Sequence, residues 1–424
     1  MKARVWLLLS LFATGVTWLY VSRVLGPWEH YVDVEHGILK AQMGDLYPRW
    51  VGTRELLLHG RNPYGPEVSH EIQMAYYGHG VEQKYGEGEI VLDEQRFVYP
   101  VYVVFLLAPT VYMDFPQLQV WAALVFALLT AISVFLWMDV LRWRPPSALA
   151  AAIVLFVLCS PQIVQGLRLR QMGLAVGFLL ALSAWCVVRN HLVLAGIALA
   201  LSTVKPQMMV LPLAWFLLWS VGAWPKRWPL LAGFAGALIT LVALGQFILP
   251  GWIRFFLEGL AAYRKYIPMS SLLRVALGDW VGIVVSGIGV CGLLLWAWLN
   301  RRADAVSPEF AQTLAACFVG ASLALPLVPP FNQVLLLLPV LMIARDWTSQ
   351  PGAIRRFLSL VAPWPWMAYL ALLLIRPRLD SPNRFPLLPA AIVLFLPFFL
   401  ALMLAIRWSK GNSTPAPAMD LRLS

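Results

Sequence analysis

Apolar segments long enough to cross a lipid bilayer recur along most of this chain. A membrane-spanning helix needs about 20 predominantly apolar residues, and such stretches alternate with short connections between residues 98 and 407. Of the 424 residues, 60% are hydrophobic and 12% are charged, whereas soluble proteins carry roughly 25% charged residues. These proportions exclude a soluble domain, a disordered chain and a fibrous repeat. The sequence predicts an all-α polytopic membrane protein.

We expect the first span near residues 4–25. It begins with basic residues, as a signal peptide does, but it lacks a small-residue cleavage site and is therefore expected to be retained. The further apolar segments are 98–113, 117–141, 147–166, 171–188, 192–204, 207–223, 228–249, 279–299, 310–325, 331–345, 354–375 and 387–407. Residues 1–408 are predicted to form a single transmembrane domain. The tail 409–424, rich in Ser, Pro and Ala, is expected to be disordered in the cytoplasm.

Basic residues between the apolar segments orient the predicted bundle. Lys and Arg concentrate in cytoplasmic loops, which explains the net charge of +11 better than nucleic-acid binding does. With the clusters at Arg142, Lys226 and Arg301 in the cytoplasm, the chain makes about 12 crossings. Segment 98–113 reaches only about 24 Å as a helix, short of the ~30 Å apolar core. We therefore expect it to be a re-entrant segment that enters and leaves from the outer side.

The long polar loop 26–97 follows the first span and is predicted to face the exoplasm. It holds 12 of the 21 acidic residues and five of the six histidines. Loops of this length are usually functional. No pair of histidines has a metal-binding spacing, and Cys159, Cys186, Cys291 and Cys317 each lie within an apolar segment. Neither a metal site, nor a disulfide, nor a cofactor is predicted.

Within this loop, a short amphipathic helix is expected to begin near Asp45. Leu46, Trp50 and Leu57 fall on one helical face, and His59-Gly60 ends the helix. Such a helix can lie flat on the outer membrane surface. Asp45 itself has two interpretations. It is either the N-cap of the helix or a general base that meets a membrane-borne substrate just outside the bilayer.

Three basic residues stand out against the apolar background. Lys205 lies between two apolar runs and precedes a proline that breaks the helix, and an ionisable group at membrane depth indicates function. Arg168 and Arg170 lie at the predicted outer boundary, against the positive-inside trend. They either extend to lipid headgroups or bind a phosphate, whose oxygens the guanidinium group matches in bidentate fashion.

The order of these features resembles a known family. It consists of Asp45, Gly60-Arg61-Asn62-Pro63-Tyr64, Tyr99-Pro100, Gln171, Lys205-Pro206-Gln207, and Ser271 with Arg274. The set, which covers roughly residues 40–345, resembles the polyprenol-phosphate-mannose-dependent mannosyltransferases of glycosyltransferase family 87, in the GT-C superfamily. The resemblance implies a GT-C-like bundle of about 12 helices and a hexose, expected to be mannose, transferred with inversion from a polyprenyl phosphate.

The residues fit this chemistry in the following roles. Asp45 is the expected catalytic base, and the expected phosphate-binding residues are Lys205, Arg168, Arg170 and Arg274. The expected substrate pocket is formed by Tyr64, Tyr99, Gln171, Gln207 and Asn332. The partners are the lipid-linked sugar donor, an acceptor that is a lipid, a glycan or a protein, and the membrane lipids. The expected location is the bacterial cytoplasmic membrane, with the site facing the exoplasm.

Two other functions remain open at this point. A flippase or transporter of lipid-linked sugars also handles such donors, but the chain lacks the internal repeats that many transporters have. A polytopic scaffold leaves Lys205 and the outer arginines unexplained. A transferase consumes the lipid-linked donor, whereas a flippase moves it without consuming it.

Overall fold

The structure of the protein is a computed structural model that describes residues 3–35, 43–81, 94–263, 270–327, 329–348 and 396–405. All regular secondary structure in these residues is helical, and no strand occurs among them. This confirms the all-helical class that the sequence predicts.

The helices follow one another with short connections. In chain order they are α1 (Ala3–Tyr20), the π-helical turn η1 (Val21–Leu25), α2 (Gly26–Glu35), α3 (Leu46–His59), α4 (Pro66–Tyr77), α5 (Val103–Leu107), η3 (Ala108–Thr110), α6 (Phe115–Val140), α7 (Ser147–Leu158), α8 (Pro161–Arg168), α9 (Gly173–Val188), α10 (Leu192–Ser202), η4 (Pro206–Met208), α11 (Val210–Gly222), α12 (Trp224–Ile248), α13 (Trp252–Tyr263), α14 (Leu272–Leu277), α15 (Asp279–Asn300), α16 (Pro308–Ala324), η5 (Pro330–Leu336) and α17 (Leu337–Thr348). A last described helix spans Leu396–Ala405.

Four of the described helices are long and apolar enough to cross a membrane, namely α1 with its continuation to Tyr31, α6, α12 and α15. The pair α7 and α8, bent by 59°, makes a fifth if it is counted as one span. The twelve expected crossings are therefore not confirmed. Pro161 begins α8 and Pro206 begins η4, so they divide two apolar runs into short helices. The expected segment 354–375 lies outside the described residues.

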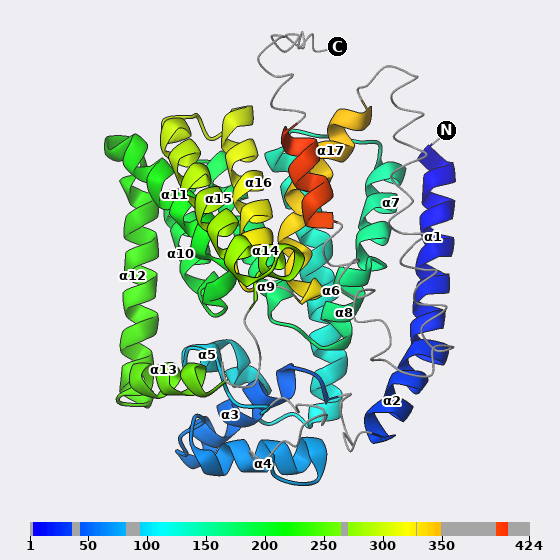
Figure 1. Ribbon diagram of the computed structural model, residues 1–424, viewed down its shortest axis with the longest axis vertical. Coiled ribbons are helices and arrows are strands. Elements are labelled where there is room, and N and C mark those ends of the chain that lie inside the picture. Colours follow the sequence, from blue (N-terminus) through cyan, green and yellow to red (C-terminus); the bar gives the residue numbers. More distant parts are fainter. Residues whose placement is uncertain are drawn as a thin grey trace.

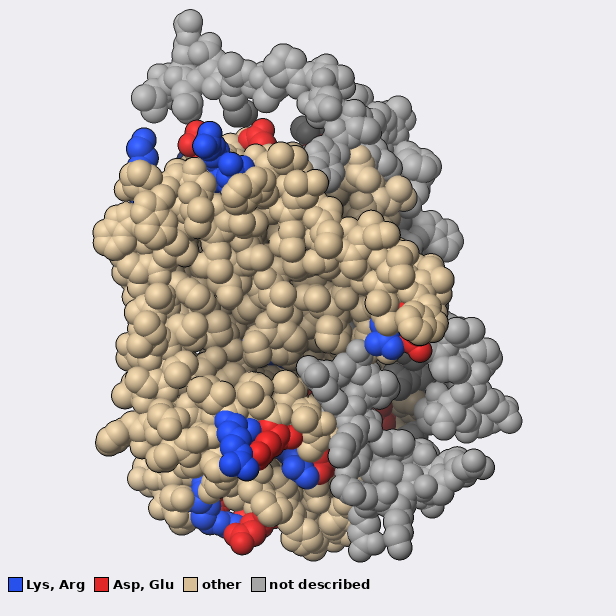
Figure 2. All heavy atoms as spheres, turned by 60° about the vertical axis from the view of Figure 1, so that its left-hand side comes forward, with Lys and Arg blue, Asp and Glu red and all other residues tan. Residues whose placement is uncertain are grey.

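The helices adopt two orientations (Figure 1). Most apolar helices stand upright beside one another, whereas α3, α4, α5 and α13 form a lower layer across one end of the bundle. On the face in Figure 2, a broad band without Lys, Arg, Asp or Glu separates two charged ends. Ile239 of α12 and Ile288 of α15 expose about two thirds of their surface. A membrane protein needs such an apolar surface where lipid tails surround it.

The turns that join α11 to α12 and α15 to α16 lie at the end of the bundle opposite the lower layer (Figure 1). Arg189, after α9, pairs with Asp139 near the end of α6 at 2.5 Å. Arg227, near the start of α12, donates to the carbonyl of Arg301 after α15 at 2.9 Å. These contacts join the ends of neighbouring upright helices, and the predicted alternation of crossings stays a prediction. The assignment of that end to the cytoplasm stays a prediction.

The segment expected to be re-entrant, residues 98–113, forms α5 and η3. Both lie in the lower layer beside α3 rather than across the bundle (Figure 1). The indole N–H of Trp50 in α3 donates to the carbonyl of Thr110 at 3.1 Å. This contact fixes the segment against the helix of the preceding loop.

The helix expected after Asp45 is α3. Gly60 follows its last residue with a φ of 67°, the left-handed conformation in which glycine commonly ends helices. Leu46 and Trp50 are buried. Leu57, expected on the same face, is 37% exposed, whereas Leu56 in the same turn is buried, so the last turn of α3 packs through a different side of the helix. The predicted location on a membrane surface remains untested.

Candidate active site at three helix breaks

Asp45 lies where the lower layer meets the upright bundle. Its backbone N–H donates to the carbonyl of Leu169, in the turn after α8, at 2.9 Å. The preceding Gly44 has a φ of 64°, and a Cβ at this residue would lie 2.7 Å from the Leu169 carbonyl oxygen. Only glycine tolerates both the conformation and the contact. The close approach of the two backbones therefore depends on the residue before Asp45.

The carboxylate of Asp45 is joined to Lys205 through one amide group. Asp45 precedes α3, but its side chain makes no capping hydrogen bond; it accepts one from the amide nitrogen of Gln171. The amide oxygen of Gln171 accepts from the Lys205 ammonium at 3.0 Å. Because a carboxylate only accepts and an ammonium only donates, these two partners fix the orientation of the amide.

Lys205 is only 5% exposed. Besides Gln171, its ammonium donates to the side-chain oxygen of Asn332 at 2.9 Å and lies 4.7 Å from the centroid of the Phe331 ring. A buried cation is costly unless such groups replace its water. Two amide oxygens and an aromatic face therefore compensate the burial of this charge.

All three polar partners come from places where helices are interrupted. Gln171 lies between α8 and α9, Lys205 between α10 and η4, and Asn332 within the 3₁₀ turn η5. Irregular backbone at membrane depth is tolerated only where it is buried in protein or lines a cavity. These interruptions bring together Gln171 and Asn332, which lie 161 positions apart in the chain (332 − 171).

Arg49 is a second cation at this place, and the sequence reasoning missed it. It lies one turn after Asp45 in α3, and its guanidinium donates to the Asp45 backbone carbonyl at 2.7 Å. The same group lies over the ring of Tyr99, 4.7 Å from the centroid. The spacing of four residues from Asp45 was the available signal, but on a surface helix that spacing usually indicates an ordinary ion pair.

The electrostatic environment of Asp45 combines opposing effects. Burial raises the pKa of its carboxyl group, and this is the largest effect, whereas the charges of Arg49 and then Lys205 act in the opposite direction. The net result is a pKa above the usual value for Asp. A carboxylate with a raised pKa is a better proton acceptor than an exposed one, which suits a general base.

The two tyrosines expected in the pocket are linked to one another. The hydroxyl of Tyr64 donates to the backbone carbonyl of Tyr99 at 2.6 Å, and its ring packs edge-on against Phe97. Tyr99 in turn contacts Arg49. Tyr99 thus borders the cluster around Asp45, whereas Tyr64 contacts the backbone of Tyr99 and none of the described contacts joins it to Asp45.

The three arginines expected at the phosphate are held by other groups. Arg168 pairs with Glu29 of α2 at 2.5 Å, and Arg170 donates to the carbonyl of Arg168. Arg274 pairs with Asp279 at the start of α15 at 2.6 Å. Among the described contacts, none joins these arginines or Gln207 to Asp45 or Lys205. Their roles in substrate binding stay predictions.

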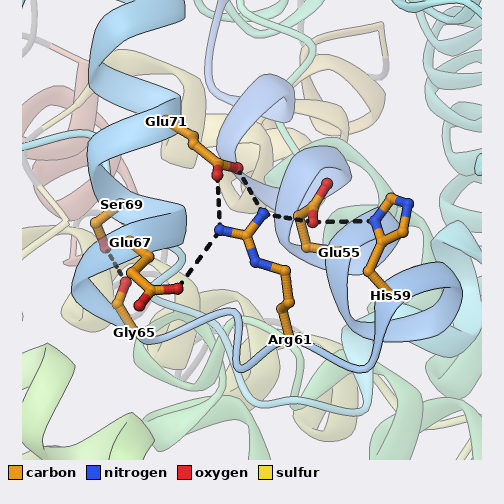
Figure 3. A network of polar contacts seen from close by, with 7 residues as sticks. All are labelled: Glu55, His59, Arg61, Gly65, Glu67, Ser69 and Glu71. Carbon is orange, nitrogen blue, oxygen red and sulfur yellow. Dashed lines mark hydrogen bonds and ion pairs between the residues drawn. The ribbon is translucent and has the colours of Figure 1, made fainter.

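A separate polar network stabilises the contact between α3 and α4 (Figure 3). The guanidinium of Arg61 contacts Glu71 at 2.6 Å, Glu55 at 3.0 Å and Glu67 at 3.7 Å, and His59 also contacts Glu55. The network fixes the turn that leads to Tyr64. Within the described residues, no group of three or more His, Cys, Asp and Glu side chains is arranged to hold a metal ion.

The apolar helices indicate a multi-pass membrane protein. The buried cluster places a carboxylate, an amide and an ammonium group in contact within it. The family model of glycosyltransferase family 87 matches residues 97–326, and the chain belongs to this family. Membership implies a membrane glycosyltransferase with a sugar donor and an acceptor. The match includes Gln171 and Lys205 but neither Asp45 nor Asn332. Neither a curated protein nor a solved structure matches the chain significantly.

Proposed function

We propose that the protein transfers a hexose, expected to be mannose, from a polyprenyl phosphate to an acceptor hydroxyl on the exoplasmic face, with inversion at the anomeric carbon. One observation carries this proposal: a single amide, that of Gln171, links the carboxylate of Asp45 to the buried ammonium of Lys205. The proposed reaction requires a base and a cation side by side.

Asp45 serves as the base in this proposal. Its carboxylate takes the proton of the acceptor hydroxyl while the acceptor oxygen bonds to the anomeric carbon. On the opposite face of the sugar, the bond from that carbon to the phosphate oxygen breaks, and the phosphate keeps the electron pair. A single displacement of this kind inverts the anomeric centre, and one positioned base is sufficient for it.

Lys205 and Arg49 supply positive charge to the leaving phosphate. Two of the three Lys205 donors bond to Gln171 and Asn332, so a third N–H can be directed to a phosphate oxygen. Arg49 offers a guanidinium fork that matches phosphate geometry. Because these cations lie in a partly dehydrated place, their effect on developing negative charge is larger than in water.

A lipid-linked donor fits the surroundings of the cluster. An apolar cavity of about 400 Å³ opens between α10 and α12, lined by Ile197, Leu201, Gly236 and Leu241 among others. Leu201 lies four residues before Lys205, so the cavity and the cation belong to the same end of α10. We propose that the isoprenoid chain of the donor lies in this cavity, with its phosphate at the end of α10 that leads to Lys205.

The test is a transfer assay with a labelled donor. Proteoliposomes that contain the purified protein, an acceptor extract from the source membranes and polyprenyl-phosphate [³H]mannose should release polyprenyl phosphate and place label in a glycan. Asp45→Asn protein, reconstituted at the same density, is the matched control. Movement of the donor between leaflets with no loss of the sugar–phosphate bond would show a flippase and refute the proposed transfer.

A further inference from the structure

The short helix α8 carries a polar stripe within an apolar bundle. Gln162, Gln165 and Arg168 follow one another at three-residue spacing and are all partly exposed, whereas Ile163, on the opposite side, is buried. Residues three apart on a helix lie on the same face, about 5–6 Å from one another. At its lower end the stripe meets α2 through the ion pair of Arg168 with Glu29.

The turn η5 connects this stripe to the site around Lys205. Its successive residues Asn332 and Gln333 point to two different partners. Asn332 accepts from Lys205 at 2.9 Å, and Gln333 accepts from the Gln162 amide nitrogen at 3.1 Å. The amides of α8 therefore begin directly beside the proposed site of transfer.

One amide of the stripe lacks a partner for its oxygen. The Oε1 atom of Gln165 is buried and accepts no hydrogen bond from any described residue. A buried acceptor without a donor destabilises the folded state, and such a group in a natural protein calls for an explanation. A bound molecule with hydroxyl groups would supply the missing donor.

We propose that Gln162 and Gln165 of α8, with Gln333 of η5, form a subsite that binds the hydroxyl groups of a sugar carried by the acceptor. An amide both donates and accepts, so a row of amides matches the adjacent hydroxyls of a hexose. The subsite carries no formal charge of its own, which suits a neutral sugar rather than a phosphate. The inference rests on the proposed function, and it narrows the acceptor to a molecule that already bears a sugar.

The first experiment measures binding without catalysis. The protein in lipid nanodiscs is mixed with methyl α-mannoside, methyl α-glucoside or methyl α-galactoside, and binding is followed by saturation-transfer NMR. We expect at least one glycoside to bind. Gln165→Met and Gln162→Met should each weaken its binding about 5–20-fold, the effect of one or two lost hydrogen bonds. Gln312→Met, a half-buried glutamine of α16 outside the stripe, is the matched control and should bind as the wild type does.

Thermal unfolding separates recognition from packing. Because Gln165 has an unpartnered buried oxygen, Gln165→Met should unfold at the same or a higher temperature, even though its glycoside binding is weaker. In the transfer assay, both stripe variants should raise the KM for the acceptor and leave the KM for the lipid donor unchanged. If none of the three glycosides binds the wild type, or if Gln165→Met and Gln162→Met bind as well as it does, the subsite proposal is wrong.

The two proposals fail in different ways. Glycoside binding that depends on Gln165, together with no consumption of the lipid donor, would refute the proposed transfer and support the subsite. Consumption of the lipid donor, together with glycoside binding that is unchanged in Gln165→Met and Gln162→Met, would support the proposed transfer and refute the subsite.

Discussion

Replacing Asp45 by asparagine removes a base while it changes little else. The side chain makes no capping hydrogen bond to α3, and an asparagine oxygen can accept the bond from Gln171 that the carboxylate accepts now. Because burial already disfavours the ionised carboxyl group, as its raised pKa shows, a neutral amide of the same shape should leave the protein folded. The amide cannot take the proton of the acceptor hydroxyl.

The rate of transfer should fall about 10²–10⁴-fold, the usual contribution of a positioned general base. This equals about 2.7–5.4 kcal/mol in the activation free energy. The assay is the initial rate of transfer from polyprenyl-phosphate [³H]mannose, normalised to folded protein. Asp114→Asn is the matched control, because Asp114 also precedes a helix without capping it, and its rate should stay normal. A rate for Asp45→Asn within a factor of three of the wild type would remove Asp45 from the mechanism.

Three further predictions concern the same cluster. Lys205→Met should lower the rate about 10²–10³-fold, as the loss of one donor to developing charge does elsewhere, and Lys205→Arg should retain part of it; normal protein levels with normal turnover would contradict this. Activity should fall as the pH drops through the pKa of Asp45. This pKa lies above the ordinary value of 3.8 because burial raises it. The residual activity of Lys205→Met should fall at a still higher pH, since the ammonium lowers that pKa, and a pH–rate profile checks both. Gly44→Ala should lower turnover per folded protein by up to about 10²-fold, because a methyl group clashes with the Leu169 carbonyl; an unchanged rate would show that Asp45 tolerates the displacement.

The sequence predicted the components of the cluster better than their connections. Lys205 was conspicuous as a lysine between two apolar runs, and Gly60 marked the end of α3. That Gln171 joins Asp45 to Lys205 was not predictable, because the contact spans 126 residues on one side and 34 on the other. Hydropathy gives no information about which interrupted helices meet.

For the arginines, the sequence points to different residues from those that the structure places near Asp45. The position of Arg168 at an apolar boundary predicts a binding role, but Glu29, 139 positions earlier in the chain, pairs with it. The sequence predicts no special role for Arg49, since an arginine on an amphipathic helix is ordinary. Its importance depends on the position of Tyr99 and of the Asp45 carbonyl, which only the folded chain defines. Hydropathy does not define the number of spans for a related reason: a proline within an apolar run either bends a helix or divides it, and Pro161 begins the separate helix α8.

The balance of charge supports one direction of the proton transfer. Lys205 and Arg49 contribute two positive charges, and ionised Asp45 contributes one negative charge. A polyprenyl-phosphate sugar is a phosphodiester with one negative charge, so the site with bound donor is neutral. After transfer, polyprenyl phosphate is a monoester that carries about −1.5 to −2 charges near neutral pH. If Asp45 has taken the acceptor proton, its own charge is lost as the phosphate gains one, and the site remains close to neutral. Proton transfer to a distant group would leave uncompensated negative charge in a partly dehydrated place, which is costly. The same carboxylate that activates the acceptor therefore also balances the departure of the phosphate.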